Sequence, residues 1–138
     1  MKISTNTRYA LRFLARLAAS GEERMTTASI AALEGISEKM LERIAAKLKR
    51  EGFVRSTRGI GGGYELAIPA EEITVTQILR TMETSFLPLH CTGEDECCPA
   101  GDVDCRLHRM LERVDRAILS VTDAVTVADL LREENGRK

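Results

Sequence analysis

The chain has 138 residues and a formal net charge of −1 at pH 7, and 43% of its residues are hydrophobic. This length suits one domain, or one small domain with an appendage, and no apolar run approaches the roughly 20 residues of a membrane-spanning helix. Arg12 and Arg16 interrupt the apolar residues near the start at helical spacing, which excludes a signal peptide and predicts a cytoplasmic protein with no membrane partner.

The charge is divided unevenly along the chain. Residues 1–69 carry twelve Lys and Arg against seven Asp and Glu, a net charge of +5, whereas residues 70–138 carry eight against fourteen, a net charge of −6. A chance difference between solvated helix surfaces would give the same numbers. The other interpretation is a basic half that meets a polyanion and an acidic half that does not.

The first two predicted helices lie in the basic half. Residues 5–19 form an amphipathic pattern, with apolar residues on one face and arginines on another. A second helix starts near Thr26 or Thr27, either of which is a good N-cap, and Gly35 breaks it. A short break of this kind between helices indicates a tight turn.

A third helix and a hairpin complete the basic half. Ser37 is placed to cap a helix over residues 38–50, which Gly52 stops. The pattern then changes to strand character over residues 53–58 and 64–68, with a run of glycines between them. This arrangement predicts a β-hairpin with a glycine tip.

The acidic half is predicted to be helical on both sides of a loop. Residues 74–77 form a capping box that opens a helix, and a loop follows from about residue 88 to residue 105. A long helix then runs from about residue 106 to 123, and residues 126–129 resemble one more capped turn before a polar tail that frays. The long helix has an apolar stripe at i, i+3/i+4, i+7 spacing, formed by Leu107, Met110, Leu111, Val114, Ile118 and Val121.

The spacing of small residues in the basic half is typical of a helix-turn-helix. Ala31 is small enough for the two helices to approach, Gly35 can adopt the left-handed conformation of the turn, and Leu41 packs into the angle between them. With the hairpin, the predicted fold is mainly α with a small β-hairpin: a winged helix-turn-helix DNA-binding domain over residues 1–69.

The third helix would enter the major groove of double-stranded DNA, and the hairpin would be its wing. Charged residues on this helix could also form a plain solvated face. A nucleotide-phosphate loop is excluded because Tyr64, and not Lys followed by Ser or Thr, comes after the glycine run. The predicted DNA-binding residues, which offer donors, an acceptor for cytosine, or close backbone approach, are Ser37, Lys39, Glu42, Arg43, Arg55, Arg58, Gly61 and Gly62.

All four cysteines of the chain fall in one short stretch, flanked by its only two histidines. Clustered cysteines in a cytoplasmic protein more often bind metal than form disulfides. Soft thiolates on a Gly- and Pro-containing loop suit an iron–sulfur cluster or zinc. We do not expect an enzyme, because there is no Ser-His-Asp set and no phosphate loop. The candidate ligands are Cys91, Cys97, Cys98, Cys105 and His108, with His90 in reserve.

Several segments resemble the Rrf2 family of bacterial winged-helix transcription regulators, whose members include IscR, NsrR and CymR. They are residues 2–11, 36–42 and 48–66, above all Arg-Gly-x-Gly-Gly-Gly-Tyr at positions 58–64, together with the long helix and residues 125–130. The resemblance implies a homodimer on a palindromic operator. In such a dimer the long helix of each subunit crosses to the other, so residues 70–138 would form a cysteine-loop and dimerisation region.

The resemblance also bears on the ligands. Cluster-binding members use three cysteines of this loop, and Cys91 and Cys105 map readily, whereas Cys97 and Cys98 compete for the middle place. His108 follows Cys105 at the spacing of IscR-like proteins and is the leading fourth ligand. NsrR-like members use an acidic residue near the N-terminus of the partner, where this chain has Arg8, which cannot ligate.

The function predicted from these features is a transcriptional regulator whose operator binding is modulated by a cluster, of the 2Fe–2S type in the first instance. A zinc-stabilised or thiol-switch regulator of the same fold is the first alternative. An iron–sulfur electron carrier or accessory protein is the second, although a carrier would need neither the helix-turn-helix nor the wing.

Overall fold

The structure is a computed structural model that describes residues 3–84 and 106–135, with side chains described as far as residue 132. None of the helices in these ranges has the length and hydropathy that crossing a bilayer would require. In chain order the elements are α1 (Thr5–Ala19), α2 (Thr27–Glu34), α3 (Glu38–Arg50), β1 (Val54–Thr57), β2 (Gly63–Leu66), η1 (Ala70–Glu72), α4 (Val75–Met82), α5 (Arg106–Ala124) and α6 (Val127–Asn135).

Each of the first four α-helices begins after a Ser or Thr N-cap. The capping side chain accepts a hydrogen bond from the backbone N–H three residues further on, which satisfies one of the free donors of the first turn. At α4 the side chain of Gln77 also accepts from the N–H of Thr74, which confirms the predicted capping box. These caps are Ser4, Thr26, Ser37 and Thr74.

The turn between α2 and α3 has the predicted helix-turn-helix geometry. Gly35 adopts a left-handed conformation with φ of +64°, and the N–H of Ile36 donates to the carbonyl oxygen of Ala31 at 3.0 Å. Leu41 is fully buried. The fold class predicted from sequence is therefore confirmed for this half of the chain.

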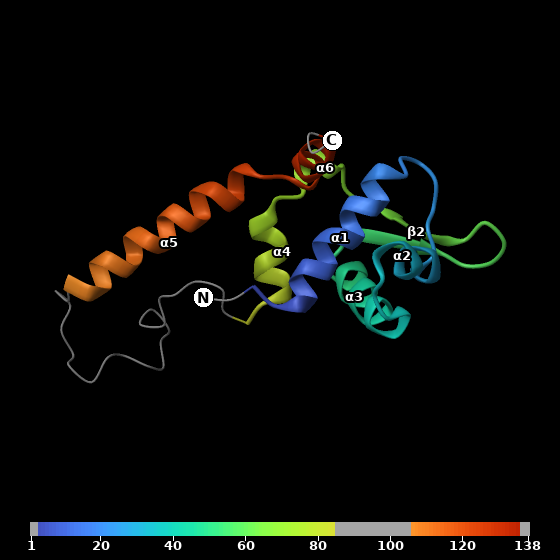
Figure 1. The fold of residues 1–138 in the computed structure, drawn as a ribbon, viewed down its shortest axis with the longest axis horizontal. Helices are drawn as coiled ribbons and strands as arrows, with labels where there is room; N and C mark the ends of the chain where they lie inside the picture. The colour runs from blue at the N-terminus through green and yellow to red at the C-terminus, as the bar shows by residue number, and fades with distance from the viewer. Residues whose placement is uncertain (1–2, 85–105, 136–138) are drawn as a thin grey trace.

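The wing is an antiparallel hairpin that is tied to the helical body. β1 and β2 pair from Val54 opposite Leu66 to Thr57 opposite Gly63. Tyr64 also exchanges backbone hydrogen bonds of 2.7 and 3.0 Å with Met25, and its ring meets that of Phe13 edge-on at 5.7 Å between centroids. These contacts fix the direction in which the hairpin projects from the body (Figure 1).

One hydrophobic core joins the two halves of the chain. Phe13 and Leu14 of α1 lie at its centre, and Ile73, Ile78 and Val127 from beyond residue 69 belong to the same cluster of buried residues. The division at residues 69 and 70 stays a prediction about function, because these side chains pack across it.

The C-terminal helix is longer than the sequence pattern indicated. The sequence predicted a capped turn leading to Leu130 and Leu131 and a fraying tail over residues 133–138, but α6 runs from Val127 to Asn135, and the remaining tail residues lie outside the described residues. The N–H of Val127 donates to the carbonyl of Ile73, and the N–H of Val75 donates to the carbonyl of Val125, both at 2.9 Å. Val127 is fully buried, so its packing stabilises a segment whose local sequence is a weak helix signal.

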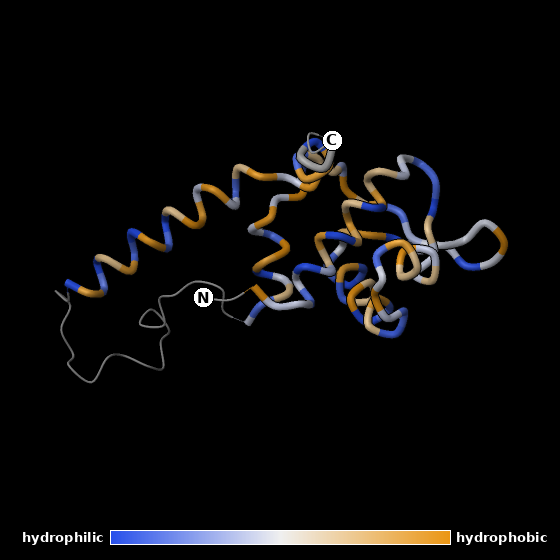
Figure 2. The backbone as a smooth tube through the Cα atoms, viewed as in Figure 1, coloured by the Kyte–Doolittle hydropathy of each residue, from blue (hydrophilic) through white to orange (hydrophobic). Residues whose placement is uncertain are grey.

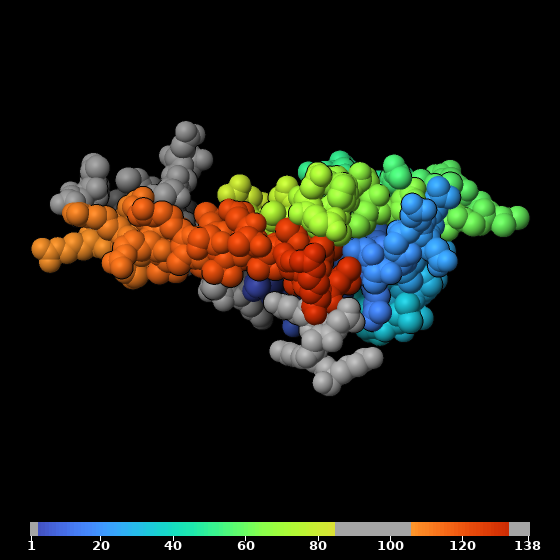
Figure 3. All heavy atoms as spheres, turned by 90° about the horizontal axis from the view of Figure 1, so that it is seen from above, coloured from blue at the N-terminus to red at the C-terminus, as the bar shows by residue number. Residues whose placement is uncertain are grey.

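Helix α5 projects away from this body, on the side opposite the wing (Figures 1 and 3). Among the described residues, its C-terminal part is tied to α4, where the hydroxyls of Thr122 and Thr76 lie 2.5 Å apart. Hydrophobic and hydrophilic residues alternate along the projecting part (Figure 2). Its bounds agree with the predicted helix to within one residue.

Candidate nucleic-acid interface and metal site

Helix α3 presents one buried and one exposed face. Leu41 and Leu48 are fully buried in the core, whereas Lys39, Glu42 and Arg43 are exposed on the other side. The helix therefore offers the predicted side chains to a partner. The roles assigned to them in reading DNA stay predictions.

Ser37 has a structural task in addition to the predicted one. It is exposed, and its Oγ accepts from the N–H of Met40 at 3.3 Å as the N-cap of α3. The hydroxyl hydrogen remains free to donate to an acceptor in front of the helix N-terminus.

Several basic residues of this half have partners, and others do not. Arg12 and Arg16 of α1 both pair with Glu34 of α2, and Arg24 and Arg55 both pair with Glu65 of the wing. In contrast, four basic side chains make no ion pair and no hydrogen bond within the part of the chain that the structure describes: Lys39, Arg43, Lys47 and Arg58. These unpaired charges gather on α3 and at the wing tip, which is where a polyanion would be held.

Arg55 and Arg58, which were predicted to play similar parts, differ in the structure. Arg55 faces Glu65 across the hairpin, and its Nε lies 2.8 Å from a carboxylate oxygen of Glu65. The hydrogen bond from Arg55, opposed by burial and aided by Arg24, lowers the pKa of Glu65. Arg58 has no such partner among the described residues and lies exposed beside the glycine tip.

The two glycines predicted to approach DNA are also required by the turn itself. Gly61 has φ of +71°, which disfavours any residue with a side chain. A Cβ at Gly62 would lie 2.4 Å from the carbonyl oxygen of Thr57, too close for any non-glycine residue. Both positions therefore shape the wing, whatever they contact on DNA.

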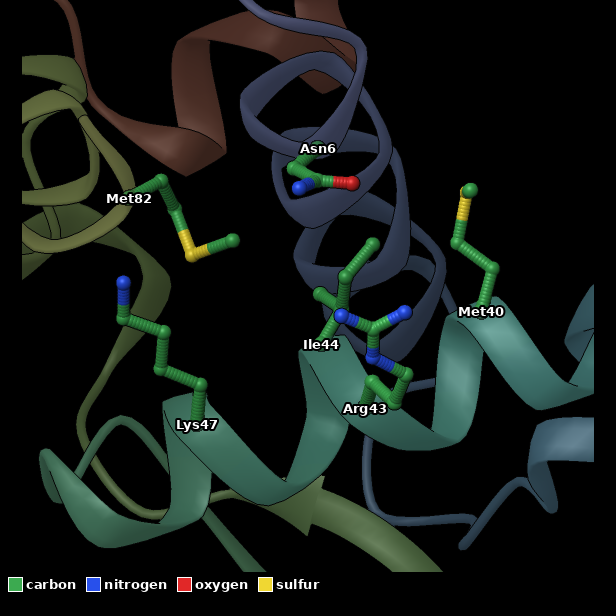
Figure 4. Close-up of a pocket in the computed structure, with 6 residues that line it drawn as sticks. All are labelled: Asn6, Met40, Arg43, Ile44, Lys47 and Met82. Carbon is green, nitrogen blue, oxygen red and sulfur yellow. The ribbon is translucent and has the colours of Figure 1, made fainter.

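A pocket of about 200 Å³ lies where α3 meets α1 and α4 (Figure 4). Sequence reasoning missed it, because its walls come from three segments far apart in the chain. The i, i+4 spacing of Arg43 and Lys47 on α3 was the one available signal. Its lining residues are Asn6, Met40, Arg43, Ile44, Lys47 and Met82.

Most of the predicted metal site lies outside the described residues. This applies to Cys91, Cys97, Cys98 and Cys105, and to His90. His108 is described: it lies in the first turn of α5, and its Nε2 is 3.5 Å from a carboxylate oxygen of Glu112. Residues 3–84 and 106–135 contain no cluster of three or more metal-ligating side chains.

The predicted apolar stripe on α5 is largely uncovered. Leu107 is 58% exposed, Met110 46%, Val114 39% and Val121 63%. Leu111 and Ile118 are half-buried. Four large apolar side chains on one face of a projecting helix are more than isolated surface residues.

A comparison with protein families matches residues 3–133 to the family described as Rrf2, iron-dependent transcriptional regulator. The match covers nearly the whole chain and includes the helix-turn-helix, the wing and α5.

Curated and solved proteins agree with this match. The chain is 42% identical over 138 residues to the transcriptional regulator IscR of Cereibacter sphaeroides, covering 97% of this chain and 89% of that protein. It is similar to the solved structure of CymR, described as the global cysteine regulator of B. subtilis, with a TM-score of 0.79, 34% identity, and coverage of 96% and 98%. It is equally similar to T. potens IscR, with a TM-score of 0.79, 31% identity, and coverage of 100% and 92%.

Proposed function

The chain belongs to the Rrf2 family of DNA-binding transcriptional regulators, which are not enzymes, and on that premise we propose that it is a cluster-regulated member of the family. In this proposal a homodimer binds a palindromic operator, and an iron–sulfur cluster held by the cysteine loop sets the affinity. The three parts of the proposal rest on different observations.

The unpaired cations of α3 and the wing carry the proposal for the DNA surface. Lys39 and Arg43 face away from the core, and Arg58 lies at the wing tip without a counter-charge among the described residues. Lys and Arg that neutralise DNA phosphates release condensed counterions, and this release supplies much of the affinity. Glu42 on the same face is the acceptor proposed for a cytosine amino group.

The uncovered stripe of α5 supports the dimer. Burying an exposed Val or Leu side chain contributes about 1.5–3 kcal/mol, and four such side chains lie on one face. A second copy of α5 would present the same stripe, as a two-fold interface requires. Two helix-turn-helix units would then face half-sites about 34 Å apart.

The donor set supports the cofactor. Four thiols and an imidazole within 18 positions are soft ligands that suit an iron–sulfur cluster. Cys91, Cys105, one of Cys97 and Cys98, and His108 would hold it. When bound, the cluster would supply a redox-sensitive, oxygen- and iron-responsive group next to α5, because His108 lies in the first turn of that helix.

A zinc-stabilised or thiol-switch regulator of the same fold is the second candidate. Two observations favour it: Cys97 and Cys98 are adjacent in the sequence, and a similar structure is that of a cysteine regulator, CymR. An electron carrier gains nothing from unpaired cations on α3. Localisation in the cytoplasm, where thiols stay reduced, is part of either proposal.

Anaerobic purification followed by visible and EPR spectra and by iron, sulfide and zinc analysis tests the cofactor. DNA affinity is then measured with and without the cofactor, on a selected operator and on the DNA upstream of the gene that encodes this chain. Iron with acid-labile sulfide and an affinity that changes on cluster loss are the expected results. A colourless protein with stoichiometric zinc would replace the cluster by the second candidate. Absence of salt-sensitive DNA binding would overturn the regulator.

A further inference from the structure

The pocket at the junction of α1, α3 and α4 has a distinct chemical character. Arg43 and Lys47 rise from α3 toward Asn6 on α1 and Met82 on α4 (Figure 4). None of its lining residues is acidic. The polar groups that line it are therefore two cations and one amide, over an apolar base that includes Ile44.

The two cations are not neutralised by ion pairs. Neither Arg43 nor Lys47 makes an ion pair or side-chain hydrogen bond within the described residues. Burial would raise the pKa of Glu83, but hydrogen bonds from Thr7 and Ser4, together with the charge of Lys47, lower it, so a carboxylate acts on Lys47 from outside the pocket lining. The carboxylate of Glu83 accepts hydrogen bonds from the N–H of Ser4 and from the hydroxyl of Thr7, and it makes no ion pair with Lys47. Two positive charges and no acidic residue in the lining leave the pocket suited to an oxyanion.

The position of the pocket on α3 relates it to the DNA-facing surface. At 100° per residue, Lys39, Glu42 and Arg43 lie on the exposed face, and Lys47 lies beside Arg43 at its edge. Arg43 therefore belongs to both the exposed face and the pocket. A helix of 10–12 Å diameter fills a major groove about 12 Å wide, so residues at the edge of its base-facing side meet the phosphates of the groove wall.

We propose that this pocket seats one backbone phosphate of the bound DNA, with Lys47 and Arg43 as its cations and the Asn6 amide as a donor. The volume of about 200 Å³ is below the roughly 300–1,000 Å³ of pockets for drug-sized ligands, and it suits a single phosphate group. The proposal deepens the proposed function and rests on it for the presence of DNA. It adds Asn6 and Lys47 to the interface and makes α1 a third element that touches DNA, after α3 and the wing.

The test is the salt dependence of DNA binding for Lys47→Gln. A phosphate contact carries no sequence information, so the variant is expected to bind every duplex roughly threefold to tenfold more weakly. The slope of log K against log salt concentration is expected to fall by about 0.9, the value for one lost phosphate. Arg80→Gln is the matched control, because Arg80 is an exposed cation on the face of α4 opposite Met82.

A second measurement separates DNA phosphate from a free oxyanion. The side-chain amide of Asn6 is followed by NMR while inorganic phosphate or a duplex is added. The expected result is a shift with the duplex and none with millimolar phosphate. Saturable binding of inorganic phosphate alone would make this a free oxyanion site and overturn the assignment to DNA.

The DNA measurements distinguish failure of the regulator from failure of the phosphate pocket. If wild type and Arg80→Gln do not bind DNA, the regulator itself fails. If both bind but Lys47→Gln keeps the wild-type slope of log K against log salt concentration, or loses affinity for one sequence only, the pocket does not bind a DNA phosphate. The assignment as a regulator would then still hold.

Discussion

Glu83 shows how one side chain joins distant parts of this fold. It is the C-cap residue of α4, and its Oε1 accepts from the N–H of Ser4 at 2.8 Å and from the hydroxyl of Thr7, which is fully buried. Burial alone would raise the pKa of Glu83, but these hydrogen bonds and the charge of Lys47 outweigh it, so the pKa is lowered. The carboxylate thus holds the start of α1 against the end of α4.

The lowered pKa predicts a pH dependence that Glu83→Gln should remove. A carboxyl whose folded-state pKa is depressed contributes stability above its unfolded pKa and loses that contribution as the pH falls through the folded value. At pH 7 we expect Glu83→Gln to lower the free energy of unfolding by about 1–2 kcal/mol. The difference from wild type should shrink as the pH falls below about 4.3, the ordinary pKa of a glutamate, because the folded-state pKa of Glu83 is lower still.

Urea unfolding at a series of pH values measures this difference. Glu72→Gln is the control, since Glu72 is exposed and its side chain makes no ion pair or hydrogen bond within the described residues. A constant difference between wild type and Glu83→Gln across the acid range would mean that the charge of Glu83 is not what stabilises the junction.

The contrast between the two wing arginines gives a second prediction. Arg58 has no counter-charge among the described residues, whereas Arg55 is paired with Glu65. Arg58→Ala should therefore lower DNA affinity by about 1–2 kcal/mol, roughly tenfold, and Arg55→Ala should lower it less. Fluorescence anisotropy gives the affinities, and light scattering checks that both variants stay dimeric. An equal loss for the two variants would contradict the assignment.

For single residues, the sequence predicted which side chains are exposed better than it predicted which other side chains they contact. It grouped Arg55 with Arg58 because both belong to the predicted wing. Only the register, with Arg55 opposite Glu65, separates them. It also left Lys47 out of the candidate site, because Asn6 and Met82, which complete the pocket, lie far away in the chain. Pairing and pocket formation depend on tertiary contacts that no local pattern contains.

Helices and turns with strong local sequence signals were predicted well, whereas the length of α6 was not. The caps, the turn at Gly35 and the bounds of α5 follow from single residues and helical periodicity. Helix α6 has a polar second half, and its first turn is held by the backbone of Ile73 and by the burial of Val127. Its length therefore depends on long-range packing.

Thr126 caps the N-terminus of α6, and this cap can be tested by substitution. Thr126 Oγ1 accepts from the N–H of Asp129 at 3.2 Å, and Asp129 Oδ2 accepts from the N–H of Thr126 at 3.0 Å. Thr126→Ala should cost about 1 kcal/mol of stability, as for other N-caps, whereas Thr126→Ser should cost little. Thermal unfolding measures both. If Ser and Ala are equally destabilising, the hydroxyl does not stabilise the helix.

At the scale of the whole molecule, the proposed DNA surface and the proposed dimer surface are separate. The wing projects at one end and α5 at the other (Figure 1), with the α1–α3–α4 body between them. His108 is in the first turn of α5, and Glu83 is the last residue but one of the described segment that precedes the cysteine loop. A change at the loop therefore has two covalent routes, through α5 to the partner subunit and through α4 to α1.

This separation predicts that the dimer can be broken without unfolding the winged helix. Val114 is 39% exposed within the apolar stripe, and an Asp there would bury an unpaired charge in the interface. We expect Val114→Asp to be monomeric by light scattering, to keep its far-UV circular dichroism, and to lose most of its affinity for a two-half-site operator while keeping weak binding to one half-site. Ser120→Asp, which adds the same charge to the exposed polar face of α5, should remain dimeric. A dimeric Val114→Asp protein with full operator affinity would show that α5 is not the interface, and the stripe would then need another partner.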